Sequence, residues 1–429
     1  MKLAFRLVAL SLLAASSMWI NGACAADRLV PPSRWSPSWM SSAESTWPQG
    51  FVLPTGMPPA FDHQTVRQSA RLSVGGTALR ITVSNEYSAS PLRIGAASVG
   101  LMADPGTGRT EHPKAVTFAG HPYVVVPAGA TATSDPVDFA VAPLTTLAVS
   151  VFLPGASAPG GFHWLAQGTV HVAEGDQTSA TSLPSNALKL TGRAFLGTIS
   201  VLGGGVPHTV AAIGDSLTDG VGATPDADRR WPDALAEELA GQGIGVLNAG
   251  IAGGRLLRNG MGLSALARIE NDAFQQPGLE AIVVQLGTND IGWPGGPFAP
   301  ADTPMSPQEF IDGYRQLIAK ARVHNIRIIA VTVPPFKDAL QGTPLEGHYS
   351  EAKERTRQAV NKWIRECAEF DAVADADRAL RDAADRARLA PEFDSGDHLH
   401  PSDAGHRAIA HLVAQSLRSA GARSNIVSR

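Results

Sequence analysis

Two patterns of hydrophobic and polar positions divide the chain near residue 205. Before that point, short apolar runs alternate with polar residues, as in Leu79–Val83, where Arg and Thr separate Leu, Ile and Val. This alternation is typical of strands with one buried face. Gly, Pro, Asn and Asp stand between the runs and mark turns. The pattern predicts strands at 79–83, 92–99, 115–118, 123–126, 137–141, 147–153 and 169–172.

Many short strands of this kind, separated by turn residues, predict an antiparallel β-sandwich of the jelly-roll type over residues 27–200. After residue 205 the pattern changes to alternating strands and helices, which implies a mostly parallel sheet covered by helices on both faces. Ser306-Pro307-Gln308-Glu309 is a capping box with proline at the first helical position, so a helix is expected to start there. Strands are predicted at 209–213, 245–248, 281–286, 326–333 and 370–374, and helices at 231–240, 264–272, 307–322, 350–369 and 402–420.

Polar or glycine-rich segments follow three of these predicted strands. They contain Ser216, Gly253 and Asn289. Ligands of such sheets bind beyond the carboxyl ends of the strands, so the three residues are expected to converge there. A serine on a tight turn between strand and helix can also project its hydroxyl clear of the fold, as an activated nucleophile must.

A fourth segment, Asp397-His398-Leu399-His400-Pro401, stands just before the last predicted helix. Together the four segments resemble the sequence blocks of the SGNH (GDSL-type) hydrolases: Ser216, Gly253, Asn289, and His400 with Asp397. The resemblance covers roughly residues 205–418. It implies a three-layer α/β/α SGNH (flavodoxin-like) catalytic domain, placed here at 205–420, that hydrolyses esters without a cofactor.

The residues before 200 resemble the N-terminal portion of some secreted bacterial GDSL esterases. The matching features are Trp35-Ser-Pro-Ser-Trp39, Gln64-Thr-Val-Arg67, Val83-Ser-Asn85 and Ser134-Asp-Pro136. This portion is expected to be an accessory β-domain without catalytic groups.

The chemistry requires these residue types. A serine at its free pKa is a poor nucleophile and needs a base, which His400 can supply. Asp397 can hold the imidazole in the right tautomer and stabilise the imidazolium. By resemblance, the oxyanion donors are the backbone N–H groups of Ser216 and Gly253 and the side-chain amide of Asn289. Glycine suits position 253 because a backbone donor there must approach the substrate without a Cβ in the way.

A metal site is the rival interpretation of His398, His400, His406 and Asp397. No ligand spacing such as HExxH occurs, so no metal is expected. His406 is placed on the surface of the last helix and His398 in a loop. The G-x-S-x-G turn of α/β-hydrolases is absent, because Thr218 rather than glycine stands two residues after Ser216.

Two irregular segments are expected to border the site. Gly292–Pro307 is long for a connection in a compact domain, which favours a binding loop. Its Trp293 is either a pocket wall or a packing residue. The segment 334–349 is a second loop that helps to shape the site.

Residues 1–25 have the features of a secretory signal peptide. Lys2 and Arg6 precede an apolar stretch, and Ala23-Cys24-Ala25 has the small-x-small cleavage pattern. A lipoprotein anchor at Cys24 is the weaker alternative, because Asn21 stands where a bulky aliphatic residue is expected. Cleavage leaves Cys367, expected to be a buried structural thiol, as the only cysteine. The protein is therefore predicted to be secreted or periplasmic.

The formal net charge of −4 gives no electrostatic reason to expect nucleic-acid binding. No second apolar run is long enough to span a membrane, so no stable insertion is expected after signal cleavage. The expected function is a secreted serine ester hydrolase that acts on short acyl groups, above all acetyl, of small-molecule or polysaccharide esters. A lipolytic esterase or lysophospholipase is the enzymatic alternative, and a glycan-binding protein with an inert SGNH domain is the other. The oligomeric state is open.

Overall fold

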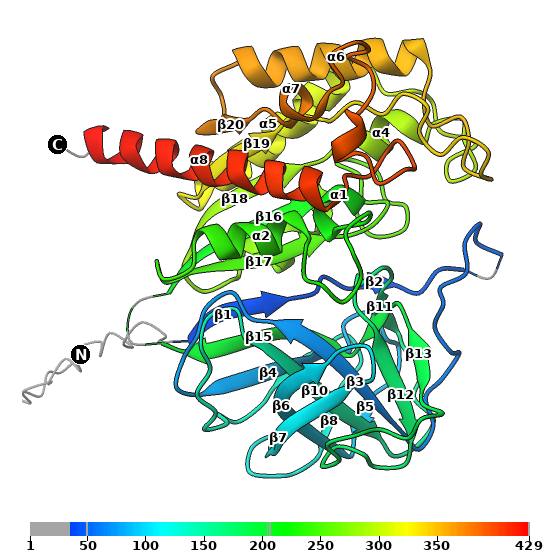
Figure 1. The fold of residues 1–429 in the computed structure, drawn as a ribbon, viewed down its shortest axis with the longest axis vertical. Helices are drawn as coiled ribbons and strands as arrows, with labels where there is room; N and C mark the ends of the chain where they lie inside the picture. The colour runs from blue at the N-terminus through cyan, green and yellow to red at the C-terminus, as the bar shows by residue number, and fades with distance from the viewer. Residues whose placement is uncertain (1–34, 49, 204, 206, 428–429) are drawn as a thin grey trace, which may run out of the picture. The chain divides into compact units, whose positions relative to one another are not determined.

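The residues before 203 form a β-rich region of antiparallel strands (Figure 1). The computed structural model describes residues 35–427 except 49, 204 and 206, with side chains up to residue 421. The predicted signal peptide lies outside the described residues. One sheet has the order β1(Trp35–Met40), β15(Leu196–Leu202), β4(Leu79–Ser84) and β9(Thr131–Thr133). A second, larger sheet has the order β13(Leu188–Leu190), β12(Val170–Glu174), β3(Gln64–Arg71), β10(Thr146–Leu153), β6(Ala96–Asp104) and β7(Arg109–Val116). Two smaller sheets complete the region: β14(Arg193–Ala194), β11(Gly161–His163) and β2(Glu44–Ser45) form one, and β5(Leu92–Ile94) and β8(Val124–Val126) form the other.

The two larger sheets share one hydrophobic core, which makes this region a sandwich. Ile81 and Ile199 come from the four-stranded sheet, Val66 and Val149 come from the six-stranded sheet, and all four side chains are fully buried in the same cluster. Alternate residues of β4 are buried, as expected for a strand with one face on a core. The predicted antiparallel sandwich is therefore confirmed, whereas its jelly-roll connectivity stays a prediction.

Several predicted strands of this region have other boundaries. The strand at 92–99 is interrupted at Gly95 and forms β5(Leu92–Ile94) and β6. The expected strand at 137–141 is only a pair of isolated bridges, at Val137 and Val141. The strand expected at 115–118 is β7, which begins at Arg109, because an exposed edge strand needs no apolar alternation.

The residues from 208 onward form an α/β region around a five-stranded sheet. Every neighbouring pair is parallel. The sheet has the order β17(Ile244–Gly250), β16(His208–Gly214), β18(Leu279–Gln285), β19(Arg327–Val331) and β20(Ala372–Ala374). Numbered from β16, the first of these strands along the chain, the order across the sheet is 2-1-3-4-5. This order is that of the flavodoxin-like doubly wound fold.

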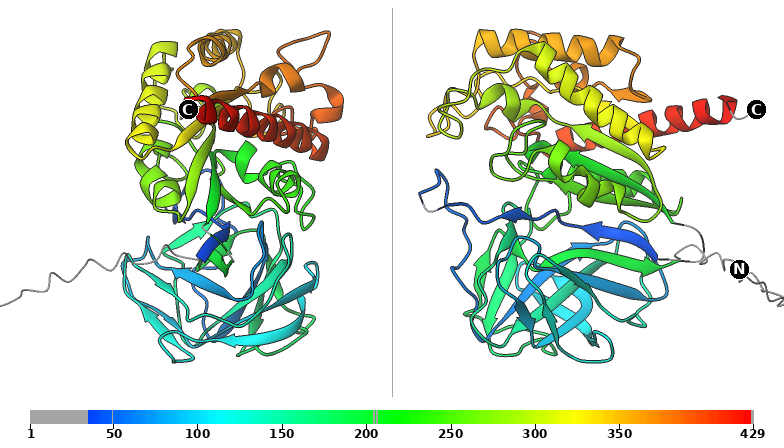
Figure 2. Two further views of the ribbon diagram at one scale, coloured as in Figure 1. Left: turned by 90° about the vertical axis from the view of Figure 1, so that its left-hand side faces the viewer. Right: turned by 180° about the vertical axis from the view of Figure 1, so that it is seen from behind.

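Helices cover both faces of this sheet (Figure 2). On β16, Ala211 and Ile213 face one cluster and Val210 and Ala212 face the other, because successive strand side chains point to opposite faces. The first face is covered by α3(Ala265–Ile269), α5(Pro307–Val323) and α6(Glu351–Glu366). The second is covered by α2(Trp231–Glu238), α7(Ala376–Leu380) and α8(Asp403–Val427). The predicted three-layer α/β/α architecture is confirmed.

Local sequence signals explain helix α5, whose start the sequence predicts from a capping box. Ser306 caps α5 by accepting the N–H of Glu309 at 3.2 Å, and the Glu309 carboxylate accepts the N–H of Ser306 at 2.8 Å. Phe310, Tyr314 and Leu317 then recur on one face and are fully buried against the sheet. The helix expected at 264–272 is instead α3 followed by one π-helical turn, η1(Glu270–Phe274).

The β-rich and α/β regions belong to one compact unit, residues 33–429. Strand β1 lies beside β17 (Figure 1). Ser73 Oγ accepts the N–H of Val246 at 3.0 Å, and a Cβ on Gly245 would lie 2.5 Å from the carbonyl oxygen of Pro37. The approach is therefore close enough to require glycine at position 245.

Candidate active site

The four residues with chemistry come from separate elements that meet at the carboxyl end of the parallel sheet. Ser216 opens α1(Ser216–Asp219) directly after β16, and Asn289 lies in α4(Thr288–Gly292) after β18. Gly253 follows β17, and His400 lies in the loop before α8. Neighbouring parallel strands end at the same edge, so this topology brings distant segments together.

Ser216 stands on a tight turn that local interactions hold in place. Asp215 caps α1 by accepting the N–H of Leu217 at 3.0 Å, and Gly220 ends the helix with φ +115°. A Cβ on Gly214 would lie 2.0 Å from Thr218 Oγ1, so the turn needs glycine there. Burial raises the pKa of Asp215 to about 8.

A series of hydrogen bonds joins Ser216, His400 and Asp397. Ser216 Oγ lies 2.9 Å from His400 Nε2, and His400 Nδ1 lies 2.6 Å from Asp397 Oδ2. The Asp397 carboxylate only accepts, so Nδ1 carries a proton and Nε2 is free to accept the serine proton. This is the arrangement that activates a serine nucleophile.

The Asp397 carboxylate is itself fixed by the loop that carries it. Its Oδ1 accepts the backbone N–H groups of His400 at 2.8 Å and Leu399 at 2.9 Å. Burial alone would raise the pKa of Asp397, but the hydrogen bond and the charge of His400 outweigh burial and hold this pKa below its usual range. The group is therefore ionised at neutral pH and able to orient the imidazole.

The predicted oxyanion donors Gly253 and Asn289 line the same cavity as Ser216. Gly253 has φ +73°, and a Cβ there would lie 2.3 Å from Met261 Sδ and 2.7 Å from the Trp293 ring. Glycine is thus required by the backbone and by these side chains, in addition to the approach of a substrate. Asn289 is buried, and its Nδ2 donates to the carbonyl oxygen of Gly254 at 3.1 Å. An amide NH₂ has two hydrogens, so one remains for another acceptor.

Asp290 holds the loop that carries Gly253. Both of its carboxylate oxygens accept the N–H of Leu256, at 3.0 and 2.9 Å. Burial raises the pKa of Asp290 to about 6, although its hydrogen bonds and Arg255 favour the charged form. Asn289 and Asp290 therefore both hold the segment that directly follows Gly253, through Gly254 and Leu256.

A cavity of about 120 Å³ opens onto Ser216, and most of its lining is apolar. Trp293 and Phe298 stack with ring centroids 4.6 Å apart, so Trp293 both packs and forms a wall. The segment 334–349 also contributes, as expected. The lining residues are Leu53, Trp164, Leu165, Ser216, Val221, Ala252, Gly253, Met261, Asn289, Trp293, Phe298, Leu340, Leu345, His348, Leu399 and His400.

Three of these lining residues come from the β-rich region: Leu53, Trp164 and Leu165. No periodic pattern marked them, because they lie in irregular segments that reach the site only through tertiary packing. The β-rich region therefore forms part of the pocket wall, a contribution that the sequence did not indicate.

The remaining histidines have separate partners. His398 Nδ1 lies 2.5 Å from Asp394 Oδ2. The placement of His406 on the surface was wrong: it is fully buried, with Nε2 3.3 Å from the carbonyl oxygen of Val221, because the segment after α1 covers the first turn of α8. Cys367 is only half-buried. Within the described residues, no group of three His, Cys, Asp or Glu side chains is arranged to hold a metal ion.

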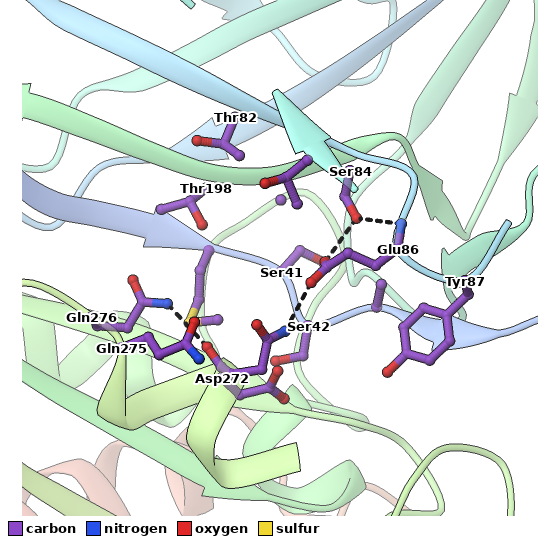
Figure 3. Close-up of a pocket in the computed structure, with 15 residues that line it drawn as sticks. Ser41, Ser42, Thr82, Ser84, Glu86, Tyr87, Thr198, Asp272, Gln275 and Gln276 are labelled. Carbon is purple, nitrogen blue, oxygen red and sulfur yellow. Dashed lines mark hydrogen bonds between the residues drawn. The ribbon is translucent and has the colours of Figure 1, made fainter. Parts of the chain in front are cut away.

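A second cavity, of about 190 Å³, lies between β1, β4 and β15 on one side and η1 on the other (Figure 3). Its lining is mainly hydroxyl, amide and carboxylate groups, including Ser84, Glu86 and Gln276. Neither Ser216 nor His400 contributes to it. The larger cavity is thus a polar cleft between the two regions, separate from the candidate active site.

A known protein family matches the part of the chain that contains Ser216 and His400. The sequence model of the GDSL-like lipase/acylhydrolase family matches residues 212–408. A GDSL-like lipase from Bacteroides thetaiotaomicron is 18% identical, with 49% of this chain and 88% of that chain covered and a TM-score of 0.37. A catalytic mutant of an acetylxylan esterase from Geobacillus stearothermophilus is 23% identical, with 50% and 94% covered and a TM-score of 0.35.

A search of curated protein sequences returned no match to this chain. In the part of the chain that the structure describes, no helix is both long enough and apolar enough to cross a membrane.

Proposed function

We propose that this carboxylic ester hydrolase, in which residues 212–408 form a GDSL-like lipase/acylhydrolase domain, cleaves short-chain acyl esters through Ser216, His400 and Asp397. The hydrogen bonds from Ser216 to His400 (2.9 Å) and from His400 to Asp397 (2.6 Å) support this proposal most directly. They supply a nucleophile, a base and an orienting carboxylate in the order that acyl transfer needs.

In the proposed reaction, Ser216 Oγ attacks the ester carbonyl while His400 Nε2 takes its proton. The backbone N–H groups of Ser216 and Gly253 and the amide of Asn289 stabilise the resulting oxyanion. The tetrahedral intermediate collapses, the C–O bond to the alcohol breaks, and the alcohol leaves with the proton from His400. Water, deprotonated by the same histidine, then attacks the acyl-enzyme and releases the acid.

The acyl group is proposed to be short, with acetyl preferred and a carbohydrate as one candidate for the alcohol. A cavity of about 120 Å³, closed on one side by Trp293 and Phe298, suits a small group better than a long chain. Its apolar lining also favours a second candidate, a lipolytic esterase, because such a surface stabilises methylene groups. Acyl chain length separates the two.

Export from the cytoplasm is part of the proposal and rests on the sequence of residues 1–25 alone. A polymer substrate would need an enzyme outside the cell, which agrees with a carbohydrate ester. Detection of mature protein that begins at Ala26 in a periplasmic or culture fraction would support export, and full-length protein in the cytoplasm would refute it.

The testing experiment is a hydrolysis panel. Wild-type protein and Ser216→Ala are compared on p-nitrophenyl esters from acetyl to decanoyl, on acetylated xylan and on phospholipid. Activity that depends on Ser216 and peaks at acetyl to butyryl supports the proposal. Highest activity on decanoyl esters or phospholipid supports the lipolytic alternative, and activity that survives in Ser216→Ala refutes the mechanism.

A further inference from the structure

A histidine of the β-rich region reaches the turn that carries the nucleophile. His163 ends β11(Gly161–His163), and its Nε2 lies 2.9 Å from Oδ1 of Asp219, the last residue of α1. Its Nδ1 lies 2.8 Å from the carbonyl oxygen of Ser42, also in the β-rich region. Asp219 is only 1% exposed and His163 7%. The contact is therefore shielded from water, where a hydrogen bond to a charged group is strongest.

The two partners of His163 determine where protons lie. A carbonyl oxygen can only accept, so Nδ1 carries a hydrogen toward Ser42. Nε2 and Asp219 Oδ1 therefore share a second proton, which lies either on the ring, with Asp219 as a carboxylate, or on the Asp219 oxygen, with the ring neutral. In both states one proton lies between the two groups and fixes the Asp219 rotamer.

Asp219 in turn connects the helix that carries Ser216 with the segment that carries Gly253. Its second oxygen, Oδ2, accepts the N–H of Ala252 at 3.2 Å. Ala252 immediately precedes Gly253, and Asp219 lies one helical turn after Ser216. The nucleophile and the glycine N–H are thus held together through one buried carboxylate.

Asp219 lies in a buried environment beside Glu44, so a change in the orientation of its carboxyl group is unfavourable. Buried Glu44 lies close enough that burial, followed by the charge of Asp219, raises the Glu44 pKa well above its usual value. Without His163, Asp219 Oδ1 would lose its hydrogen bond in a site shielded from water, which favours a turn of the carboxyl group toward other donors. Such a movement would displace Ala252 and Gly253.

We propose that His163 is a positioning residue for the reaction: through Asp219 it sets the place of the Gly253 N–H relative to Ser216. This inference rests on the proposed function. It assigns to the β-rich region a role in the transition state, beyond its part in the pocket wall. A displacement of about 1 Å at a reacting group is enough to cost on the order of 100-fold in rate.

The test compares three variants with wild type. His163→Leu removes both hydrogen bonds, and His163→Gln retains one donor toward Asp219. His171→Leu is the matched control: His171 is another buried histidine of the β-rich region, and its Nε2 lies 2.7 Å from the carbonyl oxygen of Pro105, within that region. The measurements are kcat and KM on p-nitrophenyl butyrate, the rate of inactivation by diethyl p-nitrophenyl phosphate, and the unfolding midpoint.

His163→Leu is expected to lower kcat about 10- to 100-fold with KM changed less than about twofold, since the donor acts mainly in the transition state. Inactivation by the phosphate ester should slow by a similar factor, because that reaction also develops charge on an oxygen beside Ser216. His163→Gln should lose less. His171→Leu should keep wild-type kcat even where its unfolding midpoint falls.

A folded His163→Leu protein with wild-type kcat would overturn the proposal, as would an equal loss of kcat in His171→Leu or an effect on KM alone. If His163→Leu does not fold, His163→Gln decides: a kcat lowered at least threefold at unchanged KM supports the role, and wild-type kcat overturns it. Ser216→Ala is assayed in parallel. If it is inactive while His163 variants behave as wild type, only this inference fails; if it is active, the proposed mechanism fails.

Discussion

The hydroxyl of Ser216 lies 2.9 Å from the imidazole Nε2 of His400, although 184 positions separate the two residues along the chain. The first stands at the carboxyl end of β16 and the second in the loop before α8. No local interaction could bring them together, so their contact depends on the parallel sheet and its two helical layers. Chemistry at this contact is therefore inseparable from the fold of the α/β region.

Replacement of the nucleophile gives the most direct prediction. Ser216→Ala is expected to abolish ester hydrolysis, because the members of a triad act as a unit. The change removes one oxygen from a small side chain at the start of a helix, so the unfolding midpoint should stay near that of wild type. The assay is p-nitrophenyl acetate hydrolysis with folding checked by circular dichroism. A folded variant with near wild-type turnover would falsify the mechanism.

The amide of Asn289 gives the second prediction. Asn289→Ala should lower kcat by roughly 10²–10³-fold, the usual effect of removing one oxyanion donor. The variant also loses the hydrogen bond to the Gly254 carbonyl, so some loss of stability is expected as well. Steady-state kinetics distinguishes the roles: an effect on KM alone would mean that Asn289 binds the ground state of the substrate.

The sequence predicted the α/β region well because its elements have strong local signals. All five parallel strands follow from apolar runs, and α5 follows from the capping box at Ser306. The sequence blocks then indicated Ser216, Gly253, Asn289, Asp397 and His400, which the structure places around one point. Their catalytic roles stay predictions that the experiments above address.

The features that the sequence did not predict depend on contacts between segments that are distant along the chain. Trp164 and Leu53 line the cavity from irregular stretches, and His163 reaches Asp219 from a strand of three residues. Neither periodicity nor motif marks such positions, because their environment exists only after the two regions pack together. The same reason accounts for His406: a helical position that appears solvent-facing in the sequence is covered by another segment.

Buried histidines make stability depend on pH. Burial lowers the pKa of His348 to about 3 and that of His406 to about 4, whereas an unfolded histidine has a pKa of about 6.5. Below about pH 6.5 these two histidines therefore bind more protons in the unfolded chain than in the folded chain, so their contribution to the free energy of unfolding falls as pH falls. Each histidine contributes a slope of at most about 1.4 kcal/mol per pH unit, and the loss ends below its folded pKa.

Urea unfolding midpoints between pH 7.5 and 4.5 provide the measurement. The His406→Gln variant should lose less stability than wild type as pH falls, since it lacks one of the two histidines that must be buried uncharged. A folded His406→Gln variant whose midpoint depends on pH in the same way as that of wild type would contradict this account.

Metal removal is expected to leave activity unchanged. The imidazoles of His398, His400 and His406 each have a different partner, namely Asp394, Asp397 with Ser216, and the Val221 carbonyl. They therefore do not converge on one point as metal ligands would. The check is turnover after exhaustive dialysis against EDTA and 1,10-phenanthroline. Loss of activity that added zinc restores would establish a metal requirement.

Acyl chain length is the last prediction and depends on one wall of the cavity. We expect the highest kcat/KM on acetyl to butyryl esters and a steep fall by octanoyl. Each methylene that fits a well-matched apolar pocket is worth about 1–3 kcal/mol, but the stacked rings of Trp293 and Phe298 limit the space beside Ser216. A longer chain would have to displace them, so its extra methylenes cannot be used.

Phe298→Ala should therefore shift the preference toward hexanoyl and octanoyl esters, because removal of the ring enlarges the cavity. The matched control is Phe274→Ala, since Phe274 is also partly buried and stacks on a ring, His324, with centroids 4.5 Å apart, yet does not line the cavity. The control should keep the wild-type order of substrates. If wild-type rates rise through decanoyl, the lipolytic alternative replaces the short-chain proposal. If Phe298→Ala and Phe274→Ala leave the same chain-length profile, the aromatic wall does not set the specificity.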